Sequence, residues 1–386
     1  MKVYIGGLGL RGDGYPNAAR TLALLEQQAD IEIVNCGRWL PEDLHLWKLA
    51  RMPRWRTLRW LLILIFGNLR SLLRVCARAR IAPGVLYVPY PGVFFLFWLS
   101  LLPRGWRPAC IVDSYVSIWD SMFRDRAAAK APGVASAMLK WIEARALRTA
   151  AVVLVDTQAN RDIFIADFGL DPARVRSLPL AIDEDRFTAA PPFAHRTDAR
   201  VRILFVGTLI PLHGIAVVLD AFARLADDAS LELRLIGNGQ QADRVAAFID
   251  ANPTARIHWI REWCSLDRIA AEIADADICL GVFGGEGKAA RVLPFKLYMY
   301  LARGRAIVSQ SLLSTPQDVP FPPIEAISEP LAAELADAIR RLATDPERRE
   351  RMGREAAAYY RHWLANSRVA DDWREMLARL DPQAKA

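Results

Sequence analysis

Residues 201–222 read VRILFVGTLIPLHGIAVVLDAF, and this stretch decides the fold. The β-branched, apolar run that ends at Val206 predicts a buried strand, and the spacing of apolar residues after Gly214 predicts a helix. Gly207 follows the strand directly. A glycine there lets the backbone approach a ligand, and the next helix points its N-terminal amides at any anion bound beside it.

The same pattern recurs along both halves of the chain. Short apolar runs alternate with helical patterns, which is typical of parallel sheets covered by helices on both faces. A connector rich in Pro and Ala, Thr188–Arg200, separates two such series, so we expect two doubly wound α/β domains joined near residue 190. The expected strands are Val3–Ile5, Ile31–Val34, Val85–Val88, Ile111–Val112, Val152–Val155 and Val175–Leu178, then Ile203–Val206, Leu233–Ile236, Ile257–Trp259, Ile278–Val282 and Ile307–Ser309.

Length and composition agree with two domains. The chain has 386 residues, 53% of them hydrophobic and 24% charged, which is enough apolar material for two packed cores. We expect domains at residues 1–190 and 200–365, with a last helix at 366–386 that packs back on the first domain. Five scattered cysteines lack zinc-binding spacing and are expected to be reduced. The N-terminus resembles a first strand and not a secretory signal, so a cytoplasmic location is expected.

Positive charge is concentrated in the first half. Residues 1–190 contain 25 Lys and Arg against 17 Asp and Glu, whereas the remainder contains 25 against 26. Between Asp43 and Asp113 there are eleven basic residues and no acidic residue. This composition favours an anionic partner, either nucleic acid or an anionic membrane surface.

The apolar content of this region separates the two partners. Trp55, Trp60 and Leu61–Phe66 lie among the arginines, and Val93–Leu102 is a second apolar run. Both runs are shorter than the roughly 18–20 residues that span a bilayer, whereas basic flanks with Trp and Leu fit an element lying in the interface. We expect residues 44–107 to bind the inner face of the cell membrane peripherally, and we expect no nucleic-acid partner. The alternative is a pair of buried core helices whose arginines reach the surface.

The glycines near the N-terminus are a weaker signal. GGLGLRG (residues 6–12) follows the first expected strand but lacks the G-x-G-x-x-G spacing of dinucleotide-binding domains. No acidic residue closes a second strand at the position where such domains bind ribose. NAD binding is therefore disfavoured.

Three segments of the second half, taken in order, resemble the donor-binding half of family 4 glycosyltransferases. They are FVGTLIPLHGIAVVLDAF (205–222), RLIGNG (234–239) and FGGEGKAARVLPFKLYMYLARGRAIV (283–308), and the resemblance covers residues 200–310. It implies the GT-B fold, in which two Rossmann-like domains face each other across a cleft. It also implies transfer of a sugar from a nucleotide-diphosphate sugar, with retention of the anomeric configuration.

The resemblance assigns roles to single residues. Glu286 matches an acidic residue beside the donor sugar, and Lys296 matches the lysine of a P-x-K segment. Lys288 and Arg291 precede that helix, and fixed cations there would stabilise the charge that develops on the departing diphosphate. The alternative is a solvated basic turn. The other donor-side residues implied are Gly207, Thr208, His213, Gly214, Asn238 and Gly239.

Three positions depart from the family pattern. Thr208 stands where many members have Arg, His213 where they have Lys, and Met299 where a second Glu would hold the ribose. The first two remove positive charge, although a protonated or hydrogen-bonding His213 would still serve the diphosphate. The resemblance therefore does not imply which base the donor carries.

The first half resembles the same family less closely and supplies the acceptor-side candidates. Asp113 and Asp120 lie in IVDSYVSIWD (111–120), and Asp113 is preferred as a catalytic residue because it follows a strand end. For each aspartate, a helix cap or a solvated surface position is the alternative. The other acceptor-side candidates, in the first glycine-rich loop, are Gly12, Asp13 and Gly14.

The sequence therefore favours a retaining glycosyltransferase that moves a sugar from a nucleotide-diphosphate sugar to a lipid-linked saccharide or glycolipid in cell-envelope or exopolysaccharide synthesis. No tightly bound cofactor is expected, and the nucleotide-diphosphate sugar is the donor substrate. No metal is expected either, because no D-x-D motif follows a suitable strand: the Asp275-Ala-Asp277 pair precedes its strand. The alternative is a catalytically silent, membrane-bound protein that binds a sugar nucleotide or a lipid headgroup. Met299 and Thr208 favour that alternative, and Glu286 with its neighbouring cations disfavours it.

Overall fold

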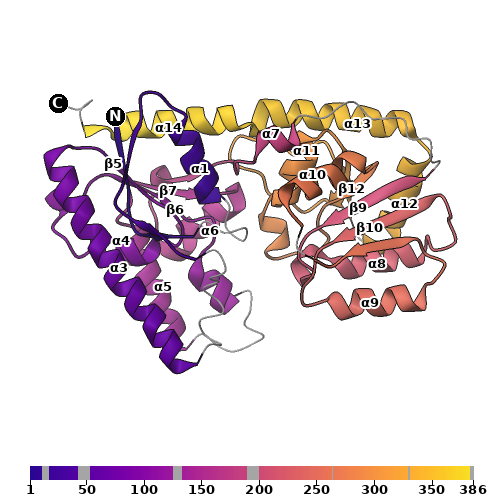
Figure 1. The fold of residues 1–386 in the computed structure, drawn as a ribbon, viewed down its shortest axis with the longest axis horizontal. Coiled ribbons are helices and arrows are strands. Elements are labelled where there is room, and N and C mark those ends of the chain that lie inside the picture. Colours follow the sequence, from indigo (N-terminus) through magenta and orange to yellow (C-terminus); the bar gives the residue numbers. More distant parts are fainter. Residues whose placement is uncertain are drawn as a thin grey trace. The chain divides into compact units, whose positions relative to one another are not determined.

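The computed structural model describes residues 1–10, 17–41, 53–124, 133–188, 200–262, 264–328 and 331–382. The chain forms two compact units, Met1–Ala181 with Val369–Ala386, and Ile182–Arg368. Each unit contains a six-stranded parallel sheet with helices around it (Figure 1). The predicted fold class, α/β with two Rossmann-like sheets, is confirmed.

In the first unit, β1 lies inside the sheet, with β3 on one side and β5 on the other. The chain therefore adds a strand on one side of β1 and then crosses to the other side. A short parallel pair, β2 (Leu8–Gly9) and β4 (Arg38–Trp39), extends from the ends of β1 and β3. The strands in spatial order are β3 (Glu32–Asn35), β1 (Lys2–Ile5), β5 (Val85–Val88), β6 (Cys110–Asp113), β7 (Val152–Val155) and β8 (Val175–Ser177).

The sheet of the second unit is also parallel, but two strands, β10 and β11, lie on one side of its first strand, where the first sheet has only β3. Its first strand, β9, lies between β10 and β12, so the chain changes sides at β9. In open parallel sheets, ligands bind beyond the carboxyl ends of the strands at such a switch point. The strands in spatial order are β11 (Ile257–Ile260), β10 (Leu231–Ile236), β9 (Val201–Val206), β12 (Ile278–Leu280), β13 (Ala306–Gln310) and β14 (Glu325–Ile327).

The first unit has a core on each face of its sheet, because successive side chains of a strand point to opposite faces. Tyr4 packs in one core, whereas Val3 and Ile5 pack in the other. The helices of this unit are α1 (Asn17–Glu26), α3 (Arg54–Ile81), α4 (Val93–Leu99), α5 (Val134–Leu147), α6 (Gln158–Phe168) and α14 (Asn366–Leu380).

Helix α14 completes the core of the first unit, although the rest of that unit, Met1–Ala181, is far from this helix in the sequence. Its first residues belong to the second unit, and the division between the units falls between Arg368 and Val369. Trp373 is 1% exposed and packs edge-on against Tyr87 of β5, with 5.1 Å between ring centroids. Met376 and Leu377 are buried in the same core.

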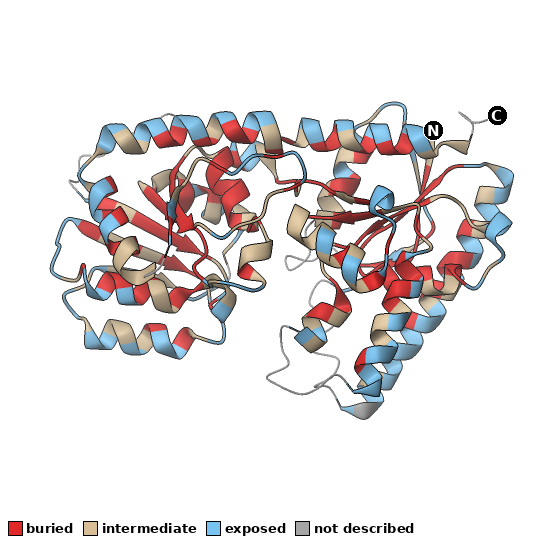
Figure 2. Cartoon of the chain, turned by 180° about the vertical axis from the view of Figure 1, so that it is seen from behind, coloured by how far each residue is buried: buried red, intermediate tan, exposed pale blue. Residues whose placement is uncertain are grey.

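Helix α3 is longer than the apolar runs of the sequence suggested. By length and composition alone, the helix Trp55–Ile81 is apolar enough to cross a membrane, because it contains an 18-residue window with a mean hydropathy of 1.6. The expectation that this region is too short to span a bilayer was wrong, because isolated arginines do not interrupt the helix. The helix nevertheless packs on the first unit: Ser71 Oγ accepts from Gly7 N at 2.8 Å and Asn68 Oδ1 from Leu8 N at 3.2 Å. Figure 2 shows exposed residues along its outer side.

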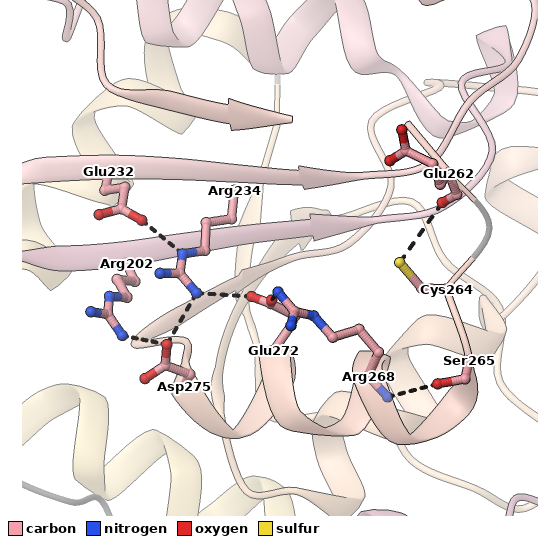
Figure 3. Close-up of polar contacts among 9 residues, drawn as sticks. All are labelled: Arg202, Glu232, Arg234, Glu262, Cys264, Ser265, Arg268, Glu272 and Asp275. Carbon is pink, nitrogen blue, oxygen red and sulfur yellow. Dashed lines mark hydrogen bonds and ion pairs between the residues drawn. The ribbon is translucent and has the colours of Figure 1, made fainter. Parts of the chain in front are cut away.

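Helix α10 is attached to the second sheet by ion pairs (Figure 3). Arg234 of β10 donates to Glu272 at 2.9 Å and to Asp275 at 3.1 Å. Arg202 of β9 also pairs with Asp275, and the Asp277 carboxylate accepts from the Arg202 amide at 2.8 Å. Both aspartates therefore serve the scaffold. The helices of this unit are α7 (Glu184–Phe187), α8 (Ile215–Ala223), α9 (Ala242–Ala251), α10 (Leu266–Asp275), α11 (Phe295–Ala302), α12 (Leu331–Ala343) and α13 (Pro346–Tyr359).

Candidate active site

The three donor-type segments meet at the carboxyl edge of the second sheet. Because β9 lies between β10 and β12, the turns that follow these strands are neighbours. Leu209 N donates to Asn238 O at 3.0 Å, and Phe283 N donates to His213 O at 3.3 Å. These bonds join the turn after β9 to the turns after β10 and β12.

Glycine is required at two positions of the turn after β9. Gly207 has φ +151°, and a Cβ there would lie 2.9 Å from His213 Nδ1 and 3.2 Å from Lys296 Nζ. Gly214 has φ +68°, and a Cβ there would lie 2.3 Å from the Phe283 backbone. The bare backbone of Gly207 thus lies over two nitrogen-bearing side chains.

Lys296 is held in the first turn of α11, which begins after Pro294. The side chain is 5% exposed, its Nζ donates to Gly281 O at 3.0 Å, and Nζ lies 3.8 Å from the centre of the Phe205 ring. Burial lowers the pKa of the amine to about 7. The site therefore contains an amine that exchanges its proton near neutral pH.

His213 is the second nitrogen-bearing side chain of this cluster. Its Nδ1 lies 2.6 Å from Thr208 O, and because a carbonyl only accepts, Nδ1 carries the proton. Burial, together with the charge of Lys296, lowers the pKa of His213 to about 3, so the ring is neutral. In this state His213 does not supply the positive charge that the family pattern has at its position.

Glu286 lies on the loop between β12 and α11. Its side chain is exposed. The preceding residue, Gly285, is held by two hydrogen bonds with Gln310. Gly285 N donates to Gln310 Oε1 at 2.8 Å, and Gln310 Nε2 donates to Gly285 O at 3.0 Å. Gln310 is 1% exposed at the end of β13. Sequence reasoning missed Gln310, whose only signal was a polar residue directly after the expected strand Ile307–Ser309.

The remaining donor-side candidates surround the same edge. Lys288 and Arg291 are half-buried at either end of the short helical turn Ala289–Arg291, which leads into α11. Thr208, Asn238 and Gly239 are exposed on the turns after β9 and β10. Met299 is 5% exposed within α11, so an apolar side chain is buried where the family pattern has a carboxylate.

In the first unit, Asp113 is the last residue of β6 and is 2% exposed. Tyr87 Oη donates to its Oδ2 at 3.3 Å, and Asn17 Nδ2 lies 3.5 Å from the same oxygen. Burial raises the pKa of Asp113 to about 7, against the opposing effect of these hydrogen bonds. The carboxyl group can therefore be protonated or charged near neutral pH.

Asp120 lies close in sequence to Asp113 but has different surroundings. It begins a π-helical turn, Asp120–Arg124, and pairs with Arg124 at 3.1 Å. The segment before it is held by Glu143, which accepts from Ile118 N at 3.1 Å and Trp119 N at 2.9 Å. Glu143 is a buried positioning residue that the sequence pattern did not reveal. The other acceptor-side candidates, Gly12, Asp13 and Gly14, lie outside the described residues.

A basic pocket of about 420 Å³ opens at the carboxyl edge of the first sheet, beside α3. None of its arginines forms an ion pair with a carboxylate in the described part of the chain. Three arginines around one cavity favour an anionic ligand. The lining residues are Leu8, Cys36, Gly37, Arg38, Gly67, Arg70, Ser71 and Arg74.

Comparison with known families identifies the class of protein. The model described as glycosyl transferases group 1 matches residues 200–345, and the model described as glycosyl transferase 4-like domain matches residues 12–181. Together they cover most of both sheets. The chain is a glycosyltransferase and belongs to the group 1 family, as the resemblance of its motifs predicted.

Solved structures with the GT-B fold resemble the whole chain. HepE of Anabaena in complex with UDP aligns with a TM-score of 0.69 at 12% identity, over 98% of this chain and 100% of that one. Sucrose-phosphate synthase of Thermosynechococcus elongatus aligns with a TM-score of 0.64 at 13% identity, over 98% of this chain and 99% of that one. The lipopolysaccharide outer core galactosyltransferase WaaB aligns with a TM-score of 0.59 at 14% identity, over 97% of this chain and 100% of that one. No curated protein sequence matches the chain.

Proposed function

We propose that this glycosyltransferase transfers a sugar, with retention of configuration, from a nucleotide-diphosphate sugar to a lipid-linked saccharide or glycolipid. The observation that carries the proposal is the turn at Gly207, whose bare backbone lies over His213 and Lys296 at the switch point of the second sheet. HepE, which shares the fold, has been solved with UDP and with UDP-glucose.

The donor side has the groups that this reaction needs. A diphosphate at the Gly207 turn would be stabilised by Lys296 and by the cations Lys288 and Arg291 as negative charge develops on it. Glu286, exposed on the loop that Gln310 fixes, would position the sugar. Retention follows the family resemblance. The described residues include no group of three potential metal ligands.

The acceptor side favours a phosphate-bearing lipid. Asp113, whose pKa lies near 7, is our candidate for the catalytic residue that contacts the acceptor hydroxyl. The pocket of Arg38, Arg70 and Arg74 suits an acceptor phosphate, and α3, which carries two of these arginines, also exposes Trp55 and Phe66, each by 62%. We therefore place the enzyme peripherally on the inner face of the cell membrane, in cell-envelope or exopolysaccharide synthesis. WaaB, named for lipopolysaccharide, shares the fold.

A thermal-shift and nucleotide-release screen tests the proposal. Purified protein is exposed to UDP-, GDP-, TDP- and ADP-sugars beside Lys296→Ala and Glu286→Ala. One nucleotide class should stabilise the wild type and not Lys296→Ala. Glu286→Ala should still bind the nucleotide but should no longer release it from the donor sugar. Stabilisation without nucleotide release, even with lipid acceptors present, would instead favour a silent sugar-nucleotide binder. Buried Met299 is the observation that keeps this alternative in the test.

A further inference from the structure

A second basic pocket lies at the opposite edge of the first sheet. It has a volume of about 340 Å³. The segment 100–107 precedes β6 and the segment 145–149 precedes β7, so both lie at the amino ends of parallel strands. Asp113 lies at a carboxyl end, and this pocket is therefore separate from the candidate active site. Its lining includes Ser100, Arg104, Arg107, Trp141, Arg145 and Arg148.

The arginines of this pocket are held in place but keep donors to spare. Arg107 Nε donates to Leu102 O at 2.8 Å, Arg145 Nε to Ser100 Oγ at 3.1 Å, and Arg148 Nε to Phe168 O at 3.0 Å. Each guanidinium has five N–H donors. Within the described ranges, none of the four arginines forms an ion pair with a carboxylate. Four cations around one cavity repel each other, and a bound anion would relieve this repulsion.

The rim of the pocket is apolar and exposed. Along α5, Val134, Met138 and Trp141 form a stripe at helical spacing and are 87%, 58% and 58% exposed. Arg145 and Arg148 continue the same spacing into the pocket. A stripe that changes from aliphatic and Trp side chains to arginine is typical of an element lying in a membrane interface.

We propose that this arginine pocket binds the phosphate of an anionic phospholipid headgroup while the α5 stripe enters the interface. A soluble phosphate would satisfy the arginines and leave Met138 and Trp141 in water. A headgroup in a bilayer would satisfy both, because the phosphate and the apolar layer are adjacent there. This contact goes beyond the proposed function and uses neither the donor site nor α3.

Sedimentation of the full-length protein with vesicles tests the proposal. Phosphatidylcholine vesicles are compared with vesicles that also contain phosphatidylglycerol, using Arg104→Gln and Arg145→Gln. Each variant should partition about fivefold more weakly onto the anionic vesicles. Arg104→Gln is the safer variant, because its side chain has no hydrogen bond or ion pair to a described residue. Arg174→Gln, an exposed arginine of the same unit, is the matched control and should partition like wild type.

A second arm distinguishes a lipid headgroup from a soluble phosphate. Met138→Gln should weaken vesicle binding as well, although it removes no charge. The proposal is overturned if the arginine variants bind anionic vesicles as wild type does. It is also overturned if Met138→Gln has no effect while glycerol 3-phosphate displaces the protein from vesicles, which would identify a site for soluble phosphate. The nucleotide screen is independent of both results.

Discussion

At the scale of single residues, the Lys296 amine makes donor binding depend on pH. Its folded pKa of about 7 is below the ordinary 10.5, so between these values the unfolded chain binds a proton that the folded protein lacks. The contribution of Lys296 to stability therefore rises with pH in this window, by at most about 1.4 kcal/mol per pH unit. A bound diphosphate would favour the charged amine. We expect nucleotide binding at pH 8 to take up protons, measured by calorimetry in buffers of different ionisation enthalpy.

Lys296→Met is the control for this prediction. It should abolish the proton uptake and weaken nucleotide binding at least tenfold, because a charge-assisted contact is lost. It should also raise the free energy of unfolding at neutral pH, on the order of 2 kcal/mol, since methionine buries no amine. Proton uptake that persists in Lys296→Met would point to another group, with His213 the nearest candidate.

Asp113 has the opposite pH dependence. Its pKa is raised from 3.8 to about 7, so between these values the folded carboxyl keeps a proton that the unfolded one loses. The contribution of Asp113 to stability is therefore present below pH 4 and lost as pH rises through 7. Asp113→Asn should flatten the pH dependence of stability between pH 4 and 7, as measured by urea unfolding. Equal slopes in the two proteins would show that Asp113 is charged throughout this range.

At the scale of elements, the ion pairs under α10 predict an asymmetric response to mutation. Glu272 is 5% exposed and pairs with Arg234, so Arg234→Met leaves a buried carboxylate with Arg268 alone. We expect a loss of about 3 kcal/mol in urea unfolding. Arg244→Met is the control, because its pair with Asp220 is exposed on both sides and should contribute less than about 1 kcal/mol. Similar losses in both variants would contradict a buried network.

Helix α3 gives the second prediction at this scale. Trp55 and Phe66 are each 62% exposed, so replacing either by Ser should leave the unfolding midpoint unchanged. Each replacement should weaken partitioning onto anionic vesicles about tenfold, because a large apolar side chain no longer enters the interface. Leu312→Ser, at a 49% exposed leucine of the second unit, serves as the control. Unchanged vesicle binding in both α3 variants would remove α3 from the membrane contact.

The sequence predicted those strands whose short apolar runs identify them without help from the rest of the fold. Every expected strand is present, because β-branched runs such as Val85–Val88 and Val152–Val155 fit a buried strand wherever they occur. The strand Glu325–Ile327 was not foreseen, since three residues at a sheet edge carry little pattern. The length of α3 was missed because its arginines were read as ends of apolar runs.

Within the candidate site, sequence order predicted which segments meet but not their electrostatic state. Strand order places the turns after β9, β10 and β12 side by side, as the motifs implied. Burial of Lys296 depends on Phe205 in β9 and on Gly281, the residue directly after β12, and no local pattern encodes that contact. The contact of Tyr87 with Asp113 is likewise set by the pairing of β5 with β6.

At the scale of the whole molecule, we expect the folding of the first unit to depend on helix α14. Trp373 fills a core formed by residues of the first half, so Trp373→Ala should cost about 3–5 kcal/mol in urea unfolding. A chain ending at residue 365 should lose the cooperative transition of the first unit. Arg379→Ala, at an exposed position of the same helix, is the control and should unfold like wild type. A chain ending at residue 365 that unfolds like wild type would contradict this role of α14.

The connections between the two units are paired with each other. Ile182 N donates to Asn366 Oδ1 at 3.2 Å, and Asn366 Nδ2 donates to Ile182 O at 2.8 Å, so the outgoing and returning segments lie side by side. A hybrid enzyme made with one breakpoint near residue 190 would therefore combine a native acceptor unit with a foreign last helix. Exchange of the acceptor unit between relatives requires two breakpoints, one on each side of this pair, so that the final helix moves together with the N-terminal half.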